Sequence, residues 1–409
     1  MISKKNINIL VFNCGSSSLK YKIFNMPSQE ILLYGEAERI GTHGQKSSMI
    51  NHYIGKKKER IKTILSDHNE AFKKVMVLIK RDGKLNKAIN FDIFAHRYVH
   101  PGNSFRSTTL VTKPVLKKLR KTLDLAPIHN GISYKMIALC SEKFKKKPQL
   151  IVFDSTFHST IPQEFSTYAI PEKLRKKYNL KKIGFHGISH KYIMQEACRF
   201  VEKPVNTQKI ISCHLGTGGS SVCAIDKGKS INNSMGFTPL EGLMMNTRCG
   251  DLDPGTVFYL MSKENLSIQE TEEILNYKSG ILGILKFSSD LRDAIEMINK
   301  DQKAKMAFDM YSQRVKKYVF FYSLLLQKPD IIVFTDSLGV LVPLLREKIC
   351  SSLKFMDIEI DKVKNNNYNK GTVEISTPSS QTKIFILPTD EEVMIAREAY
   401  KEYTHGNNN

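Results

Sequence analysis

A glycine-rich turn in the second half of the chain has the residue types of a phosphate-binding site. Gly216, Gly218 and Gly219 follow the apolar run 210–212, and a second β-type run, 220–225, comes shortly after them. This order predicts a strand, a tight turn and a strand. The turn has no P-loop lysine and opens no helix, so a phosphate would be held by backbone N–H groups and small hydroxyls. An ordinary hairpin without a ligand is the alternative interpretation of this turn alone.

A similar unit stands near the start of the sequence. The β-rich run 7–12 leads into the turn 13–18, and a second alternating run, 19–24, contains Lys20. Two such turns suggest a clamp that binds phosphate groups from both sides of a cleft. Kinases need little covalent chemistry from the protein, because positioning and charge neutralisation provide most of the catalysis.

Charged and histidine side chains follow or interrupt the predicted elements. Arg97 lies near the end of the strand 91–99, Arg248 stands close to glycines, and Asp154 ends a buried-type strand. Each has a structural explanation when taken alone, such as a surface arginine or a capping acid. Together, on loops after strands, they indicate an active site. The other candidates are His129, His186 and His190, expected in loops punctuated by Gly or Pro, and Glu391, which stands beside Glu392 where a helix N-terminus also favours acids.

The composition indicates a folded chain with two domains. Its 409 residues exceed what one core comfortably supports, and 41% hydrophobic residues argue against disorder. The formal net charge of +22 would suit a nucleic-acid binder, but the basic residues are scattered through separate stretches such as 117–121 and 143–147. We therefore expect solvated basic faces and no nucleic-acid partner. A positive field also favours small anionic substrates.

The cysteines and the N-terminal segment predict a cytoplasmic protein. The seven cysteines form no CxxC pair and have no metal-ligand spacing, which favours reduced thiols. The segment MISKKNINILVF has only a short apolar run. We therefore expect neither a signal peptide nor a membrane span.

The two halves share an order of predicted elements, which suggests a duplicated domain. Each has a Gly/Ser hairpin first and later a buried strand ending on an acid, at Asp154 in 149–154 and again at 330–336, an offset of about 200 residues. Low-complexity stretches, NNNYNK at 365–370 and the terminal GNNN, are expected to be loops without an assigned function. Further strands are expected at 31–40 and 383–387, and helices at 69–82, 114–123, 189–201, 267–277, 302–327 and 390–403.

Ordered motifs along the chain resemble those of the acetate kinase family from about residue 8 to 400. Their number and order make a chance match very improbable. They are VFNCGSSSLKYKIF (11–24), AHRYVHPG (95–102), LAPIHN (125–130), VFDSTFHSTIP (152–162), GFHGISH (184–190), HLGTGGSS (214–221), SMGFTPLEGLMMNTRCGDLDPG (234–255), KSGILGI (278–284), SSDLRD (288–293) and PTDEEVMIA (388–396).

The resemblance implies an α/β fold of two duplicated ribonuclease H-like domains around a central cleft, as in sugar kinases, heat-shock chaperones and actin. We expect one domain to comprise 1–155 plus 388–409, with its C-terminal helix packed back on it, and the other to comprise 156–387. The implied reaction is reversible, Mg²⁺-dependent transfer of the ATP γ-phosphoryl group to acetate, giving acetyl phosphate and ADP. Mn²⁺ is the alternative ion, and the implied assembly is a homodimer.

Site residues carried over from the resemblance fall into four groups. Asn13 and Glu391 match the magnesium-site residues. Asp154, His186 and Arg248 match the catalytic groups, and Arg97 matches the carboxylate-binding arginine. The acetate methyl pocket is implied at Val99, Ile128, Phe185 and Pro239. The phosphate and nucleotide contacts are implied at Ser16, Ser18, Lys20, His214, Leu215, Gly216, Thr217, Gly218, Asp290, Leu291, Arg292 and Gly339.

The chain departs from the family pattern on the nucleotide side. Thr217 stands where the family usually has Asn, Asn246 where Gly is usual, and Leu291 where Phe or Met is common. The largest departure is TDSLGVL at 335–341, where most members have the Gly-rich loop Thr-Ala-Gly-Ile-Gly-Glu-Asn. Here only Gly339 of the two glycines remains, and added side chains could narrow an adenosine pocket.

These departures leave two alternatives to an ATP-dependent acetate kinase. Amoebal relatives with a similar loop and Thr in the hairpin are associated with pyrophosphate and phosphate in place of ATP and ADP. A non-catalytic, actin-like nucleotide-binding module is the alternative of another class. Its weakness is that such a module would not need both arginines, Arg97 and Arg248, together with His186.

Overall fold

The computed structural model describes residues 6–41, 48–102 and 104–406. Contacts divide the chain into two compact units, which are considered separately. Unit 1 comprises Met1–Thr156 and Asp390–Asn409, and unit 2 comprises Phe157–Thr389. Among the described residues, no helix is both long enough and apolar enough to cross a membrane.

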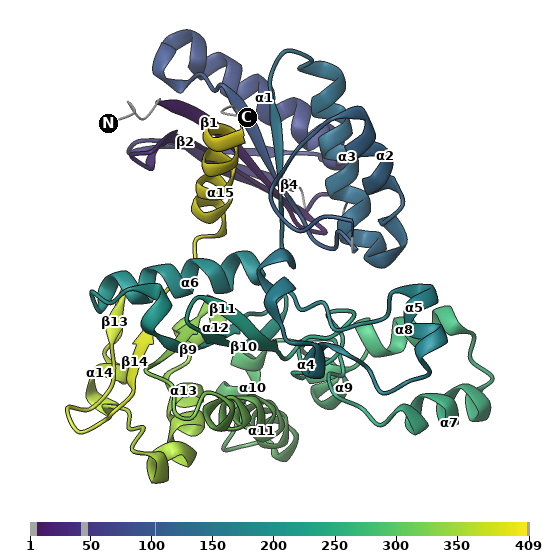
Figure 1. Ribbon diagram of the computed structural model, residues 1–409, viewed down its shortest axis with the longest axis vertical. Coiled ribbons are helices and arrows are strands. Elements are labelled where there is room, and N and C mark those ends of the chain that lie inside the picture. Colours follow the sequence, from purple (N-terminus) through teal and green to yellow (C-terminus); the bar gives the residue numbers. More distant parts are fainter. Residues whose placement is uncertain (1–5, 42–47, 103, 407–409) are drawn as a thin grey trace. The chain divides into compact units, whose positions relative to one another are not determined.

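Unit 1 is built on a mixed sheet in the strand order β5-β4-β3-β2-β1-β6-β8-β7 (Figure 1). The neighbours of β1 are β2, which is antiparallel, and β6, which is parallel. The strands are β1 (Ile7–Cys14), β2 (Ser18–Met26), β3 (Glu30–Glu38), β4 (Ser48–Ile54), β5 (Lys57–Thr63), β6 (Ile93–Tyr98), β7 (Thr109–Leu110) and β8 (Gln149–Phe153), and the helices are α1 (His68–Leu85), α2 (Lys113–Arg120), α3 (Pro127–Lys143) and α15 (Glu391–Gly406).

Alternation along β1 decides which side chains reach the core and which reach the site. Leu10, Phe12 and Cys14 belong to the apolar cluster that includes residues of α1 and α3. Because successive side chains of a strand point to opposite faces, Asn13 points to the other face. Helix α15 packs against β1, β2, β6 and β8, and its first residue, Glu391, is bonded to Asn13.

Unit 2 repeats this topology in a second sheet, β11-β10-β9-β12-β14-β13 (Figure 1). Its strands are β9 (Lys209–Leu215), β10 (Ser220–Asp226), β11 (Lys229–Asn233), β12 (Ile331–Thr335), β13 (Val373–Glu374) and β14 (Lys383–Ile386). Its helices are α4 (Gln163–Ser166), α5 (Glu172–Tyr178), α6 (Gly187–Phe200), α7 (Pro254–Glu264), α8 (Ile268–Tyr277), α9 (Gly280–Leu285), α10 (Leu291–Met297), α11 (Gln302–Leu325), α12 (Asp336–Leu341), α13 (Pro343–Cys350) and α14 (Lys362–Asn366).

The duplicated fold expected from the sequence is confirmed. The order β3-β2-β1-β6-β8 in unit 1 has the same sequence of antiparallel and parallel pairings as β11-β10-β9-β12-β14 in unit 2. In β9, Ile211, Cys213 and Leu215 enter the core beneath α11, whereas alternation turns Ser212 and His214 toward α6.

Three local expectations were wrong. His129 and His190 lie within α3 and α6 and not in loops. The segment expected as a loop at 335–341 forms α12 from Asp336 onward. The low-complexity stretch 365–370 begins inside α14, and Asn365 is fully buried because it bonds Arg346. The last three residues, 407–409, lie outside the described residues.

Candidate active site

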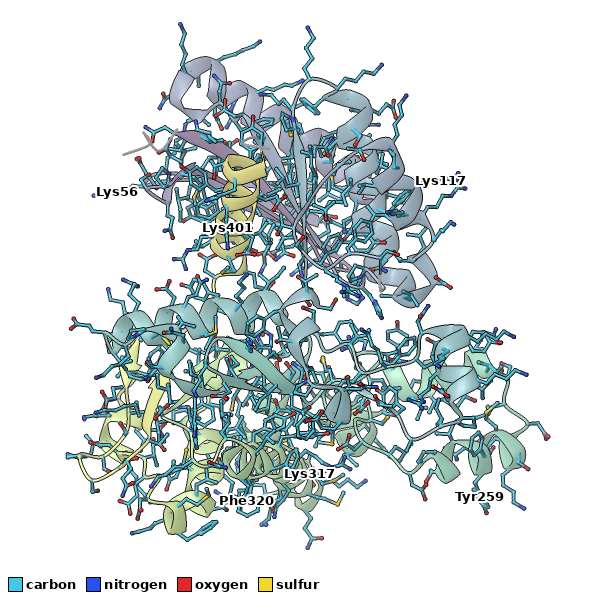
Figure 2. All side chains as sticks on the ribbon, in the orientation of Figure 1. Lys56, Lys117, Tyr259, Lys317, Phe320 and Lys401 are labelled. Carbon is cyan, nitrogen blue, oxygen red and sulfur yellow. The ribbon has the colours of Figure 1, made fainter. Side chains whose placement is uncertain are left out.

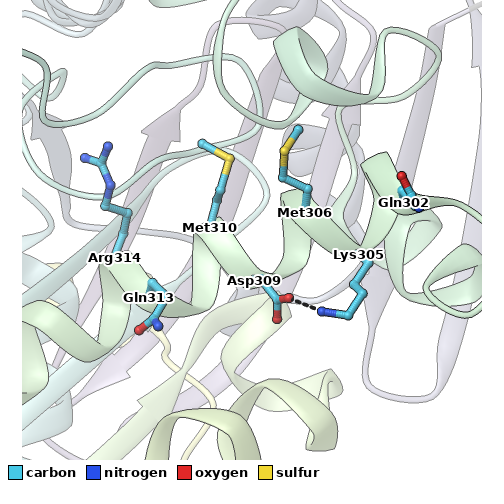
Figure 3. Close-up of a pocket in the computed structure, with 7 residues that line it drawn as sticks. All are labelled: Gln302, Lys305, Met306, Asp309, Met310, Gln313 and Arg314. Atoms are coloured by element: carbon cyan, nitrogen blue, oxygen red, sulfur yellow. Dashed lines mark hydrogen bonds and ion pairs between the residues drawn. The ribbon is translucent and has the colours of Figure 1, made fainter.

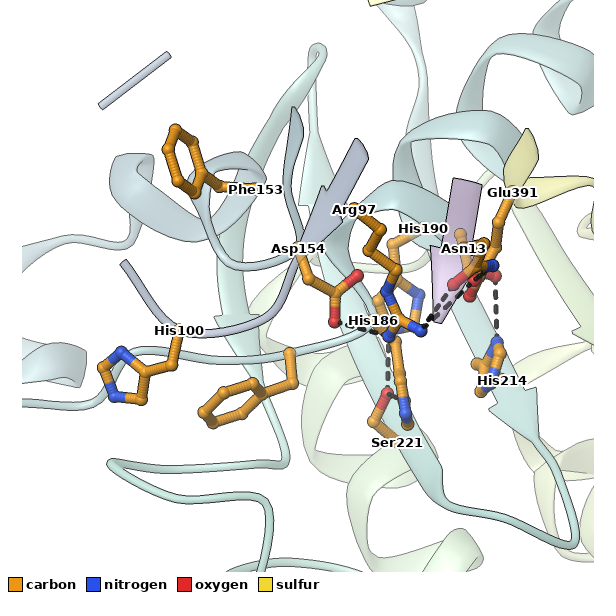
Figure 4. A network of polar contacts seen from close by, with 12 residues as sticks. Asn13, Arg97, His100, Phe153, Asp154, His186, His190, His214, Ser221 and Glu391 are labelled. Atoms are coloured by element: carbon orange, nitrogen blue, oxygen red, sulfur yellow. Dashed lines mark hydrogen bonds and ion pairs between the residues drawn. The ribbon is translucent and has the colours of Figure 1, made fainter. Parts of the chain in front are cut away.

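Asn13 is the centre of a polar cluster in unit 1 (Figure 4). Its Nδ2 donates to Glu391 Oε2 at 3.1 Å and to Glu392 Oε1 at 2.9 Å. Its Oδ1 accepts from Arg97 Nη1 at 3.3 Å. One amide therefore joins the end of β1 to the first turn of α15 and to β6.

Arg97 is largely buried and lies between two acids. Its Nη2 donates to Asp154 Oδ2 at 3.2 Å, and its Nη1 is 3.7 Å from Glu391 Oε2. Burial works against the charge, but Asp154 and Glu391 outweigh it and raise the pKa of Arg97. Its buried Nε has no hydrogen-bond partner among the described residues, and this leaves a donor for a further acceptor.

Two charged residues of this cluster were not predicted as site residues. Lys22 Nζ lies 3.0 Å from Asp390 Oδ2 and 3.2 Å from Glu392 Oε2. Burial opposes the charge of Lys22, yet these two carboxylates raise its pKa. Glu392 is buried. An acid that serves only to favour a helix N-terminus is usually exposed, so its burial points to a role in the cluster. The two adjacent acids Glu391 and Glu392 were the sequence signal that could have identified Glu392 as a site residue.

The first Gly/Ser turn joins β1 to β2. Ser16 is exposed, Ser18 is half-buried at the start of β2, and Lys20 is exposed two residues later. The carbonyls of Gly15 and Ser18 face His68 Nε2, at 2.9 and 3.3 Å. The serine hydroxyls and Lys20 are thus at the surface of unit 1, as a phosphate contact requires.

The residues around Asn13 fit a hard divalent cation in their chemistry. Mg²⁺ takes oxygen ligands and is commonly bound through one or two carboxylates together with water and substrate phosphates. Asn13 offers an amide oxygen, which here accepts from Arg97, and Glu391 offers a carboxylate that accepts from Asn13 Nδ2. Within the described parts of the chain, no group of three His, Cys, Asp or Glu side chains is arranged as a ready-made metal cage.

The glycine-rich turn of unit 2 is closed by the start of α12. Asp336 Oδ2 lies 3.1 Å from His214 Nε2, and the backbone N–H of Thr217 donates to Ser337 Oγ at 3.1 Å. A Cβ on Gly216 would lie 2.0 Å from Asp336 Oδ2, so only glycine fits there. Asp336 has a left-handed backbone, with φ of 62°, which is costly for a residue with a side chain. The altered segment therefore contacts the turn directly.

His186 and Arg248 converge on the same turn. A Cβ placed on Gly219 would be 3.2 Å from His186 Nε2 and 3.5 Å from Arg248 Nη1. His186 directly precedes α6, as its N-cap residue, with a left-handed backbone, φ of 57°. Burial lowers the pKa of Arg248, and no carboxylate among the described residues pairs with it. A half-buried cation of this kind favours an anionic ligand.

Two of the residues implied to form the methyl pocket lie in unit 1 and two lie in unit 2. Their role in binding the methyl group stays a prediction. Val99 is buried in unit 1, directly after β6. Ile128 lies in the first turn of α3, and its side chain is outside what the structure describes. In unit 2, Phe185 is buried, and the carbonyl of half-buried Pro239 accepts from Arg248 Nη1 at 3.3 Å.

Several residues that are implied to contact the nucleotide form hydrogen bonds or core contacts within unit 2. Asp290 caps α10 and pairs with Arg292 at 2.5 Å. Leu215 and Leu291 are fully buried in the core of unit 2. Gly218, in contrast, is open, since a Cβ there would meet nothing within 4 Å. Gly339 is buried in α12, and its carbonyl accepts from Arg346 Nη1 at 2.8 Å.

A depression of about 680 Å³ lies along one face of α11 (Figure 3). Its acid, Asp309, is paired with Lys305 at 2.6 Å and with Lys348 at 3.2 Å. None of its lining residues is a predicted site residue. We assign no part of the active site to it.

The sequence profile of the acetokinase family matches residues 8–397. The chain belongs to the acetokinase family. An acetate kinase of Dictyoglomus thermophilum is 43% identical to it over 399 residues, which cover 97% of this chain and 99% of that relative.

Solved structures of the acetokinase family agree with this placement. Porphyromonas gingivalis acetate kinase is 35% identical with a TM-score of 0.87, over 97% of this chain and 99% of that one. A propionate kinase from Francisella tularensis is 35% identical with a TM-score of 0.88, over 96% and 98%. The resemblance drawn from the motifs is thus confirmed, and this family of kinases does not favour the non-catalytic module.

Proposed function

We propose that this protein reversibly transfers the γ-phosphoryl group of ATP to acetate. An acetate oxygen attacks the γ-phosphorus, the bond from that phosphorus to the β,γ-bridging oxygen breaks, and acetyl phosphate and ADP result. The observation that carries this proposal is the largely buried Arg97, which is held by Asp154 and Asn13 and whose Nε has no hydrogen-bond partner among the described residues. Membership of the acetokinase family supports it.

The reaction brings two negative groups together, and two arginines in the proposed site can neutralise them. Arg97 would hold the acetate carboxylate through charge-assisted hydrogen bonds, and Arg248 with His186 would stabilise the transferring phosphoryl group at the Gly219 turn. A carboxylate is already a nucleophile at neutral pH. Asp154 therefore acts by orienting Arg97 and not as a base.

Asn13 and Glu391 would hold Mg²⁺, with Mn²⁺ as the alternative ion. Their contact places an amide and a carboxylate in the same cluster. The bound ion would neutralise phosphate charge. The carboxylate of Glu392 is engaged by Lys22 and by Asn13, so its role is to fix Asn13.

The substrate pocket would accept a short carboxylic acid. Val99, Ile128, Phe185 and Pro239 would surround the methyl group, and these apolar residues suit acetate and also propionate. The similarity to a propionate kinase agrees with this range.

We also place the protein in the cytoplasm, since its seven cysteines are unpaired and six of them are buried.

A homodimer would form through α7 and its neighbours. Helix α7 has no buried residue although it carries Phe258 and Tyr259, which are 71% and 63% exposed. Figure 2 labels Tyr259. Ile268 at the start of α8 is 69% exposed. An exposed apolar surface on adjoining helices is typical of a protein interface.

The decisive assay compares phosphoryl partners. Acetyl phosphate should form from acetate with ATP and Mg²⁺, and should be consumed with ADP. If acetyl phosphate is consumed with phosphate but not with ADP, the phosphoryl donor in the forward reaction is pyrophosphate and not ATP. Folded protein without either activity would contradict the enzymatic proposal.

A further inference from the structure

A buried chain of hydroxyl and imidazole groups in unit 2 leads away from His186. His186 Nδ1 is 2.9 Å from Ser221 Oγ, and the same oxygen is 2.9 Å from His190 Nε2 (Figure 4). His190 Nδ1 is 2.8 Å from Ser212 Oγ. Ser212, His190 and Ser221 are fully buried.

The protons available allow this chain only three arrangements. Burial lowers the pKa of His190 well below its ordinary value, and the neighbouring His158 and His214 add to the effect, so His190 is neutral. A neutral imidazole has one donor nitrogen and one acceptor nitrogen, and a serine hydroxyl has one hydrogen to donate. The three hydrogen bonds therefore run in the same direction unless Ser221 accepts from both imidazoles. That third arrangement leaves the buried Ser221 hydrogen without an acceptor among the described residues, which is costly.

In the first arrangement the bonds run inward, from His186 to Ser212. His186 Nδ1 donates to Ser221, Ser221 donates to His190 Nε2, and His190 Nδ1 donates to Ser212. The Ser212 hydroxyl then has a hydrogen but no acceptor, because His190 is its one partner among the described residues. A buried donor without an acceptor is costly.

In the second arrangement the bonds run outward, and every hydrogen has an acceptor. Ser212 donates to His190 Nδ1, His190 Nε2 donates to Ser221, and Ser221 donates to His186 Nδ1. Because Nδ1 of His186 is now an acceptor, the hydrogen of the neutral ring lies on Nε2. That nitrogen is the one near Gly219 and Arg248.

We propose that Ser212, His190 and Ser221 are positioning residues that hold neutral His186 in its Nε2–H tautomer. This inference rests on the proposed function for its catalytic meaning, since Nε2–H would then donate to a phosphoryl oxygen. His186 would need no positive charge to do so. The residues act through His186 and do not touch substrate.

The test uses the full chain with ¹⁵N-labelled histidine. The His186 signals are assigned by their loss in His186→Gln, and ring ¹⁵N shifts report which nitrogen carries the hydrogen. We expect a protonated Nε2 and an unprotonated Nδ1 in the wild-type protein. The opposite tautomer there overturns the proposal, and this readout requires no variant to fold.

Substitution of Ser212 tests the direction of the chain. Ser212→Ala removes the hydroxyl that donates to His190 Nδ1 in the outward arrangement, so it should weaken the preference for that arrangement, raise the Nδ1–H fraction of His186 and lower kcat about five- to tenfold, with the acetate KM unchanged. Ser212→Thr keeps a hydroxyl and should restore both readouts. An unchanged His186 tautomer in Ser212→Ala overturns the proposal.

Ser230→Ala is the matched control. Ser230 is equally buried and bonds a different imidazole, with its Oγ 2.8 Å from His158 Nδ1. Its loss should alter the His158 signals and leave the His186 tautomer unchanged. A wild-type Nε2–H signal in protein that does not phosphorylate acetate would support the hydrogen-bond chain and contradict the proposed function, so the two failures are distinguishable.

Discussion

The backbone N–H of Thr217 donates to the hydroxyl of Ser337, 3.1 Å away. Both residues lie in segments expected from the sequence to depart from the acetokinase pattern, and the structure places them in contact. In a phosphate-binding turn, a backbone N–H group is a natural phosphate ligand. In this protein the N–H group of Thr217 is already hydrogen-bonded to Ser337 of α12.

Replacing Ser337 should therefore release a phosphate ligand. We expect Ser337→Gly to lower the KM for ATP about three- to fivefold, the equivalent of one competing hydrogen bond. Steady-state kinetics at saturating acetate would measure it. Ser351→Gly, at an exposed position, is the control. An unchanged KM would mean that this N–H group does not contact the donor.

Arg97→Ala should abolish acetate-dependent turnover. Loss of a buried guanidinium aimed at an anion is expected to lower kcat/KM for acetate by about 100-fold or more. Arg81→Ala, which removes a more exposed arginine of unit 1, should retain activity. Circular dichroism would show that both variants are folded. Near-normal turnover in Arg97→Ala would exclude Arg97 as the carboxylate ligand.

His96 predicts how the stability of unit 1 depends on pH. Burial lowers its pKa from 6.5 to about 4, although a hydrogen bond to Gln149 opposes the shift. Between these values the unfolded chain binds the proton more readily, so stability is full above about pH 6.5 and falls toward pH 4. The difference corresponds to a loss on the order of 3 kcal/mol.

His96→Phe should reduce this slope, because Phe cannot titrate and an aromatic ring at this position stacks with both Phe12 and Phe94. Urea unfolding at several pH values, followed by circular dichroism, would measure it. His405→Asn, at an exposed position, is the control. Equal slopes in wild type and His96→Phe would contradict the prediction.

Arg346→Leu should destabilise unit 2 by about 3 kcal/mol. Arg346 is fully buried and donates to the carbonyls of Gly339 and Val340 and to Asn365, so its loss leaves several buried acceptors unpaired. Lys176→Leu, which removes one partner of an ion pair exposed on both sides, should change stability by less than about 1 kcal/mol. Equal unfolding midpoints for the two variants would show that Arg346 is dispensable.

Phe258→Glu combined with Tyr259→Glu should convert the proposed dimer into a monomer of 46.7 kDa. Light scattering after gel filtration would give the mass. Glutamates at Phe320 and Phe321 are the matched control, since these α11 residues are 40% and 44% exposed. If the second pair and not the first dissociates the dimer, the interface lies on α11.

Periodicity predicted most central elements, because their apolar side chains alternate or recur as a packed sheet and helix require. It missed β5, whose sequence KKERIKT is largely charged at the edge of the sheet. It also missed α12, since the fold there depends on Asp336 adopting a left-handed backbone against Gly216. No local pattern shows such a contact between distant segments.

The structure brings together Asn13, Arg97, Asp154 and Glu391, which the sequence analysis had selected. It adds residues whose importance depends on a neighbour. Lys22 becomes significant because α15 brings Glu392 beside it, and Ser221 because it bridges two imidazoles. Hydroxyl and lysine side chains are too common for their type alone to identify them.

The position of Glu391 in the sequence has a consequence for how the protein is made. Asn13 leaves the ribosome before any part of unit 2, but its partner Glu391 belongs to α15, which follows the whole of unit 2. The cluster around Asn13 can therefore assemble only after unit 2 has been synthesised. Translation that stops within unit 2 would leave Arg97 and Asn13 without the acids of α15, so an incomplete chain would lack this part of the site.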